Sequence, residues 1–206
     1  PQGGFCFYRY GPWGVEEPNA GDTWAAITAL RLLQQPIPRR DHVADWLLQQ
    51  QYDNGGYPSL VIAEAVLFSL RQFDATPLQD PRSYLSTHCQ STHITDQNAI
   101  DWAGWLDHTR RCLRLVTAHD LSCEPLREIV APLLHRLRAT TGGYVGSGPG
   151  LIETWHALDI FQLLQLTAEI QTLEFVRKCE PALGFTLTPG TSATSLETQL
   201  AGLCAR

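Results

Sequence analysis

The sequence predicts an all-α protein built from repeated helix hairpins. Three observations support this fold class: a Gly-Gly-aromatic turn recurs along the chain, the segments after each turn have helical periodicity, and no segment alternates apolar and polar residues as a half-buried strand does. A single helix pair cannot bury its own apolar face, so neighbouring pairs must stack as an open solenoid or a ring.

The recurring turn is present in four copies, of which the last is the weakest. The copies are Gly3-Gly4-Phe5, Gly55-Gly56-Tyr57, Gly142-Gly143-Tyr144 and Leu183-Gly184-Phe185. The interval of 87 residues between the second and third copies is about twice the shortest interval, so we expect a degenerate copy between them, with residues 98–103 as the candidate. The chain therefore contains about five helix-hairpin repeats.

Helical periodicity places the elements between the turns. The helices after the first two turns each have one apolar face, formed by Thr23, Ile27, Leu30 and Leu33 and by Leu60, Ala63, Leu67 and Leu70. Between them, Val43, Trp46 and Leu47 line a helix that stops before Gly55. Later helices are expected at about residues 95–118, 123–140, 152–166, 168–179 and 192–204, with Ser122 as an N-cap and Pro125 in a first turn.

Composition narrows the class of protein. A chain of 206 residues with 44% hydrophobic residues can form one domain over residues 1–206. The net charge of −6 makes a nucleic-acid partner unexpected. No apolar run is long enough for a transmembrane segment and the start of the sequence is unlike a signal peptide, so we expect a cytoplasmic protein.

The repeat itself resembles a known superfamily. The order Gly-Gly-aromatic, turn, acidic residue, Thr or aromatic, Ala-Leu is similar to the α/α-toroid repeat of protein prenyltransferase β subunits and squalene-type cyclases. The resemblance covers nearly the whole chain and is closest at residues 142–156, which end in Glu153-Thr154-Trp155-His156. It implies an α/α toroid or partial toroid in which the helix after each glycine pair lines the inside.

The resemblance also implies a metal site. In the prenyltransferase β subunits, residues at the positions of His156 and Asp22 bind zinc, so these two are the candidate metal ligands, and zinc or magnesium is the candidate cofactor. The family places a cysteine ligand two residues after the aspartate, where this chain has Trp24. The implied zinc site therefore lacks its thiolate.

The function implied by the resemblance is an isoprenoid-handling enzyme, prenyltransferase-like or terpene-cyclase-like, with a hydrophobic isoprenoid-like small molecule in an apolar, Trp-rich central cavity. Its candidate catalytic residues are Asp22, Glu153 and His156. A buried carboxyl group could protonate an alkene, and tryptophan faces could stabilise a carbocation. The candidate substrate-binding residues are Trp24, Glu64, Trp102, Trp155 and Tyr144.

Structural roles are the alternatives for these residues. Asp22 and Glu153 stand where helices are expected to start, and a carboxylate there stabilises the free N–H groups. Trp24 and Trp155 occupy equivalent repeat positions, as packing residues do. His156 has the alternative of a histidine that only forms hydrogen bonds on a helix wall.

Other functions stay open. A non-catalytic binding or assembly module with this fold would explain the missing zinc cysteine, the absence of basic residues near the turns that could hold a diphosphate, and the missing Asp-x-Asp-Asp motif of terpene cyclases. The first repeat has no helix before its turn, and the apolar flank left uncovered predicts a homodimer or a partner subunit that completes the ring.

A third possible function is an enzyme that acts on carbohydrates, and this alternative is supported by fold analogy alone. Two further residue sets have spacings that permit a metal site without specifying one, namely His88, Cys89, His93 and Asp96, and His119, Asp120 and Cys123.

Overall fold

The computed structural model describes residues 3–6, 17–90, 101–145, 149–180, 184–191 and 195–205. These residues form nine α-helices and one ladder of two very short strands, so the all-α fold class predicted from the sequence is confirmed. The chain divides into two compact units, Pro1–His88 and Cys89–Arg206. Whether the repeats close into a ring stays a prediction.

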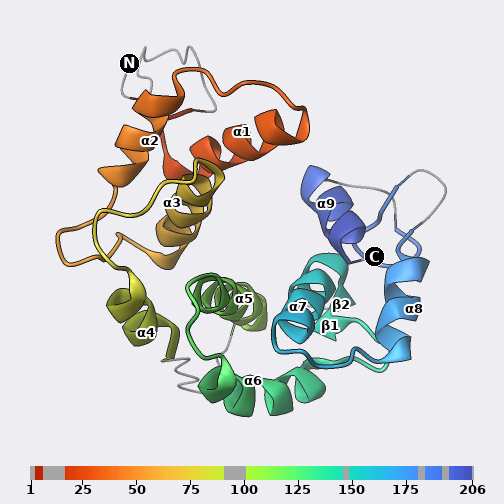
Figure 1. The fold of residues 1–206 in the computed structure, drawn as a ribbon. Helices are drawn as coiled ribbons and strands as arrows, with labels where there is room; N and C mark the ends of the chain where they lie inside the picture. The colour runs from red at the N-terminus through yellow and green to blue at the C-terminus, as the bar shows by residue number, and fades with distance from the viewer. Residues whose placement is uncertain are drawn as a thin grey trace. The chain divides into compact units, whose positions relative to one another are not determined.

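The first unit is built around the helix after the second glycine pair. Its helices are α1 (Ala20–Leu32), α2 (Arg40–Leu48), α3 (Leu60–Gln72) and α4 (Arg82–Gln90), the last of which ends in the second unit. Both α1 and α2 pack against α3 (Figure 1). The helices bury an apolar interior that includes Ile27, Leu47, Val66 and Leu70. The apolar faces expected from periodicity thus meet one another, except at Leu33, which is the C-cap of α1 and is exposed.

The second unit is built around α7, which lies between α5 and α9 (Figure 1). Its elements are α5 (Trp102–Ala118), α6 (Glu124–Leu137), β1 (Tyr144–Val145), β2 (Pro149–Gly150), α7 (Leu151–Leu163), α8 (Ile170–Lys178) and α9 (Leu196–Cys204). The antiparallel pair β1 and β2 immediately precedes α7. One buried apolar cluster joins α7, α8 and α9 and includes Leu151, Phe175 and Ala201.

Several predicted boundaries differ from the structure, including the ends of α6 and α7 at Leu137 and Leu163 and the start of α9 at Leu196. The helix expected from residue 95 begins at Trp102, because the extended residue Asp101 is its N-cap and accepts a 3.1 Å hydrogen bond from the Gly104 backbone N–H. The N-cap of α6 is Cys123 and not Ser122, whose hydroxyl accepts a 3.3 Å bond from the Glu124 N–H. Pro125 lies in the first turn, as predicted. Residues 98–100 of the candidate degenerate turn lie outside the described residues.

The glycine pairs allow the backbone to approach the following hairpin closely. Gly142 has a φ of +93°, and a Cβ there would overlap the carbonyl oxygen of Gln171 next to it. A Cβ on Gly143 would lie 2.7 Å from the ring of Phe175 on α8. The same arrangement recurs in the first unit, where Gly3 and Gly4 meet His42 and Trp46, and Gly55 and Gly56 meet Asp80 and Tyr84.

The backbone of the turn aromatic is held by a side chain from the helix that follows. The Tyr144 N–H donates a 3.1 Å hydrogen bond to the Thr154 hydroxyl, which donates a 2.6 Å bond to the Gly150 carbonyl. The Phe5 N–H donates a 2.9 Å bond to the hydroxyl of Thr23. In the last repeat the amide of Gln199 both accepts from the N–H and donates to the carbonyl of Phe185. The first turn of each of these helices is thereby fixed to its glycine turn.

The helices that follow the turns also end alike. Each of α1, α3, α5 and α7 is followed by a residue in the left-handed region, with φ between 53° and 56°, and by a backbone hydrogen bond that spans six residues. These residues are Gln34, Asp74, Asp120 and Gln165. They lie 40, 46 and 45 residues apart, which is more regular than the spacing of the glycine pairs. The shared ending identifies α5 as the helix of the predicted intermediate repeat.

One property of the helices bears on membranes. Within the ranges that the structure describes, no helix combines the length and the apolar character that crossing a bilayer requires.

We predict that Gly142→Ala destabilises the second unit by about 3 kcal/mol, because the added Cβ meets a backbone carbonyl and the residue needs a positive φ. Gly190→Ala is the control, since Gly190 has a φ of +83° with open space around its Cβ position. The control should lose only about 1 kcal/mol from the backbone conformation. Urea denaturation measures both, and equal losses would contradict the packing role of Gly142.

Candidate functional site

Three of the predicted site residues belong to the first unit. Asp22 lies in the first turn of α1, where its carboxylate accepts a 2.7 Å hydrogen bond from Asn19 Nδ2 while Asn19 Oδ1 accepts from the Asp22 N–H. Asp22 is thus part of the cap of α1. Trp24 is half-buried on α1, and Glu64 is only 1% exposed on α3.

The other predicted residues belong to the second unit. Glu153 lies in the first turn of α7 beside Gly150, where its negative charge favours the helix N-terminus. Tyr144 is buried, and its ring meets Phe161 edge-on at 6.2 Å. Trp102, the first residue of α5, meets the ring of Trp105 edge-on at 5.9 Å. Trp155 is half-buried and packs against the apolar cluster of α7, α8 and α9.

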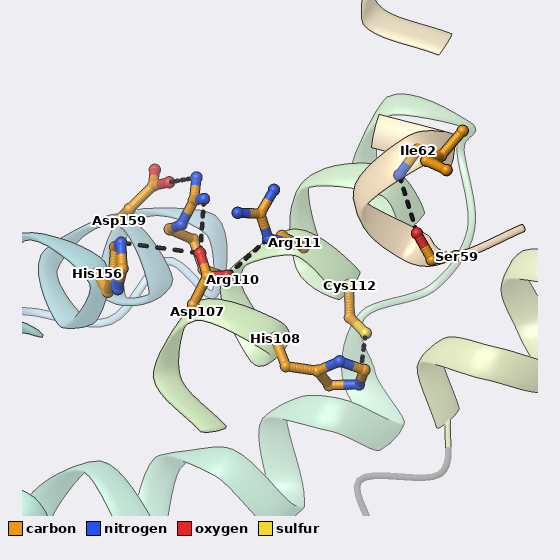
Figure 2. A network of polar contacts seen from close by, with 9 residues as sticks. All are labelled: Ser59, Ile62, Asp107, His108, Arg110, Arg111, Cys112, His156 and Asp159. Carbon is orange, nitrogen blue, oxygen red and sulfur yellow. Dashed lines mark hydrogen bonds and ion pairs between the residues drawn. The ribbon is translucent and has the colours of Figure 1, made fainter. Parts of the chain in front are cut away.

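His156 meets a charged network between α5 and α7 (Figure 2). Its Nε2 atom lies 3.8 Å from Asp107 Oδ1. The same carboxylate accepts a 2.7 Å hydrogen bond from Arg111 Nε and a 3.0 Å bond from Arg110 Nη2. Asp107 therefore links the imidazole of α7 to two guanidinium groups of α5.

Arg110 is the buried centre of this network. Its side chain is 5% exposed and lies between two carboxylates, Asp107 on its own helix and Asp159 on α7, whose Oδ2 is 3.7 Å from Nη1. The guanidinium carbon also lies 5.2 Å from the centre of the Trp155 ring, a cation–π contact. A buried cation needs such compensation, because leaving water is costly for a charge.

The surroundings of the network lower the pKa values of both His156 and Asp107. Burial lowers the pKa of His156 to about 4, and the positive charge of Arg110 acts in the same direction against the opposing charge of Asp107. Burial alone would raise the pKa of Asp107, but hydrogen bonds from Arg111 and Arg110 outweigh it, so the net shift is downward. At neutral pH the imidazole is uncharged beside an ionised carboxylate.

Some buried polar atoms of α5 and α7 have no hydrogen-bond partner within the described part of the chain. They are His156 Nδ1, Thr109 Oγ1 and Trp105 Nε1. The neighbouring Asp107 carboxylate favours a proton on Nε2 of His156, which leaves the lone pair on Nδ1. Native proteins satisfy most buried polar atoms, so such atoms are candidates for contact with a ligand.

The residues that the structure describes do not fit a metal centre. Across the described residues, no three His, Cys, Asp or Glu side chains converge as ligands of a metal ion would. Asp22 and His156 fall in different units, and His93 and Asp96 of the first alternative set lie outside the described residues. In the second alternative set, Cys123 Sγ lies 3.3 Å from the hydroxyl of Thr117.

Sequence reasoning missed four members of the network: Asp107, Arg110, Arg111 and Asp159. Part of the signal was present, because Asp107 precedes the two arginines by three and four residues, the spacing at which helix side chains meet. Asp159 likewise follows His156 by three residues. The contact between α5 and α7, however, joins residues about 50 positions apart and has no local signature.

We predict that Arg110→Met lowers the free energy of unfolding by about 2–4 kcal/mol, because it leaves two partly buried carboxylates without their shared cation. The control is Arg127→Met, which removes an exposed ion pair with Glu124 on α6 and should cost less than about 1 kcal/mol. Urea denaturation compares the two variants. A loss as small for Arg110 as for Arg127 is incompatible with a central role for Arg110.

We also predict an acid-sensitive step in stability from His156. Its folded pKa of about 4 lies below the value of 6.5 for a free histidine, so between these pH values the unfolded chain binds more protons than the folded chain. The stabilisation is present above about pH 6.5 and is lost as the pH falls towards 4, with a total of about 3 kcal/mol.

NMR titration of His156 measures its pKa in the folded protein. Urea denaturation across the same pH range measures the change in the free energy of unfolding. His156→Gln should flatten the dependence of the unfolding free energy on pH between 6.5 and 4. An imidazole that titrates near 6.5 in the folded protein would show that the network does not hold it neutral.

No protein-family model matches the chain, and no curated protein matches it in sequence.

Proposed function

We propose that this protein is an isoprenoid-handling enzyme in which His156 is a neutral general base. The observation that carries the proposal is a buried imidazole, 9% exposed, whose Nδ1 has no hydrogen-bond partner among the described residues. The substrate is a hydrophobic isoprenoid-like molecule, in line with the resemblance of the repeat to prenyltransferases and squalene-type cyclases.

The protonation state of His156 suits the removal of a proton from a carbocation. A carbocation is a very strong acid, so even a weak base accepts its proton, and a low pKa keeps the imidazole free to do so at neutral pH. The lone pair on Nδ1 would take the proton, and Asp107 near Nε2 would stabilise the imidazolium that forms. This chemistry is of the terpene-cyclase-like type.

Neighbouring groups support the same proposal. Trp155 lies beside His156, with ring centres 4.9 Å apart, and indole faces attract cationic carbon. Arg110 already occupies a position over the Trp155 ring, so Trp102 and Trp105 at the start of α5 are the further aromatic candidates for substrate contact. From the resemblance, the candidate catalytic residues also include Asp22 and Glu153. The candidate substrate-binding residues also include Glu64, Trp24 and Tyr144.

The test is turnover of isoprenoid substrates by the purified protein. Prenyl diphosphates and squalene-like polyenes are incubated with and without zinc or magnesium, and products are analysed by gas chromatography and mass spectrometry. His156→Ala should reduce product formation by about 100-fold or more, the contribution of a general base. His135→Ala, at an exposed position on α6, is the control and should retain activity.

Two results would remove the proposal. One is the absence of product from every substrate, and the other is a rate that is unchanged by His156→Ala. Asp22→Ala serves as a further comparison, because Asp22 belongs to the cap of α1 and its loss should affect stability before chemistry.

A non-catalytic binding or assembly module is the second candidate function. It is favoured by the way in which charged groups pair with one another: Arg110 and Arg111 bind Asp107, and Asp22 binds Asn19. Exposed leucines on α9, Leu200 and Leu203, support an apolar contact with a second copy or a partner subunit. A dimer of stable molar mass in solution, without turnover and without bound metal, would favour this module over the enzyme.

A further inference from the structure

Outside the charged network, a second cluster of reactive side chains lies in the second unit. Cys89 and Cys112 share a side-chain hydrogen bond, and both residues are 0% exposed. They are 23 positions apart in the sequence, and both belong to the second unit. Neither takes part in the contacts of His156, so the pair needs its own explanation.

The pair differs from the other cysteines described. All six cysteines of the chain are free thiols, including Cys179, which is just as buried. A buried cysteine on its own acts as a small apolar residue. Two thiols in hydrogen-bond contact are a different case, because their sulfur atoms are already close to each other before any bond forms between them.

A histidine connects this pair to the surface. His108, one turn before Cys112 on α5, is exposed, and its Nε2 lies 3.5 Å from Cys112 Sγ. Burial lowers the pKa of His108, so the imidazole is uncharged at neutral pH and can accept a proton. The contact gives the thiol proton of Cys112 a path to solvent as the sulfur reacts.

We propose that Cys89 and Cys112 are a redox-active dithiol that closes into a reversible disulfide when a peroxide oxidises one of the two sulfurs. One thiolate attacks hydrogen peroxide and becomes a sulfenic acid, and the other peroxide oxygen leaves as water. The second thiol then attacks the sulfenic sulfur, forms the S–S bond and expels a second water molecule. Two thiols are oxidised and one peroxide is reduced to two water molecules.

The disulfide would join the end of α4 to the middle of α5 and close the chain between residues 89 and 112. The pair is buried, so peroxide reaches it through local opening, and the reaction is slower than at exposed Cys204. Once one sulfur is oxidised, its neighbour resolves it within the same site. Oxidation at Cys89 or Cys112 therefore ends at the disulfide and not at higher oxidation states.

The experiment treats the full chain with hydrogen peroxide, removes the excess with catalase, and alkylates the remaining thiols after unfolding. Mass spectrometry of the unreduced digest should find one peptide pair linked through Cys89 and Cys112, with a mass loss of about 2 Da for the two hydrogen atoms removed. Dithiothreitol should restore both thiols. The linked pair should be absent from Cys89→Ser and Cys112→Ser and present in Cys179→Ser, the control at an equally buried position.

The unmodified chain alone can overturn the proposal, which keeps the test valid if a serine variant fails to fold. Full alkylation of Cys89 and Cys112 after prolonged treatment with excess peroxide, continued well beyond complete oxidation of exposed Cys204, would exclude a redox-active pair. Links from Cys89 to several cysteines at similar yield would show random oxidation of an opened chain. Either result leaves the proposed role of His156 unaffected, because none of these residues contacts it.

Discussion

The close approach between each glycine pair and the hairpin that follows it is the constraint on which the rest of this structure depends. At Gly142 the backbone lies against the carbonyl of Gln171, and at Gly143 it lies against the ring of Phe175, so neither position has room for a side chain. The contact recurs at the other two glycine pairs. It determines where each new hairpin begins and which residues face its neighbours.

The first turn of the following helix is fixed to this glycine turn. Thr154 holds the backbone of Tyr144 and thereby sets the start and the rotation of α7. Two and five residues further along α7, that rotation directs His156 and Asp159 towards α5. The charged network is thus a consequence of the repeat, because α5 and α7, the equivalent helices of two successive repeats, lie side by side.

The network shows how one buried cation governs its neighbours. Arg110 is buried only because Asp107, Asp159 and the face of Trp155 compensate its charge. The same guanidinium disfavours a second positive charge nearby and so adds to the effect of burial on His156. A neutral imidazole beside an ionised aspartate is an arrangement from which proton transfer can follow, and it forms the basis of the proposed function.

The amino-acid sequence determined the all-α class, the hairpin repeat and most helix positions, because these depend on local periodicity and on glycines at turns. It placed His156 and Trp155 on one helix and Asp107 and Arg110 on another. Only the tertiary structure decided that these helices meet, that Asn19 is the N-cap beside Asp22 and that Cys89 lies beside Cys112. The physical reason is that contacts between distant segments depend on how whole helices pack, and no local pattern encodes which side chains meet there.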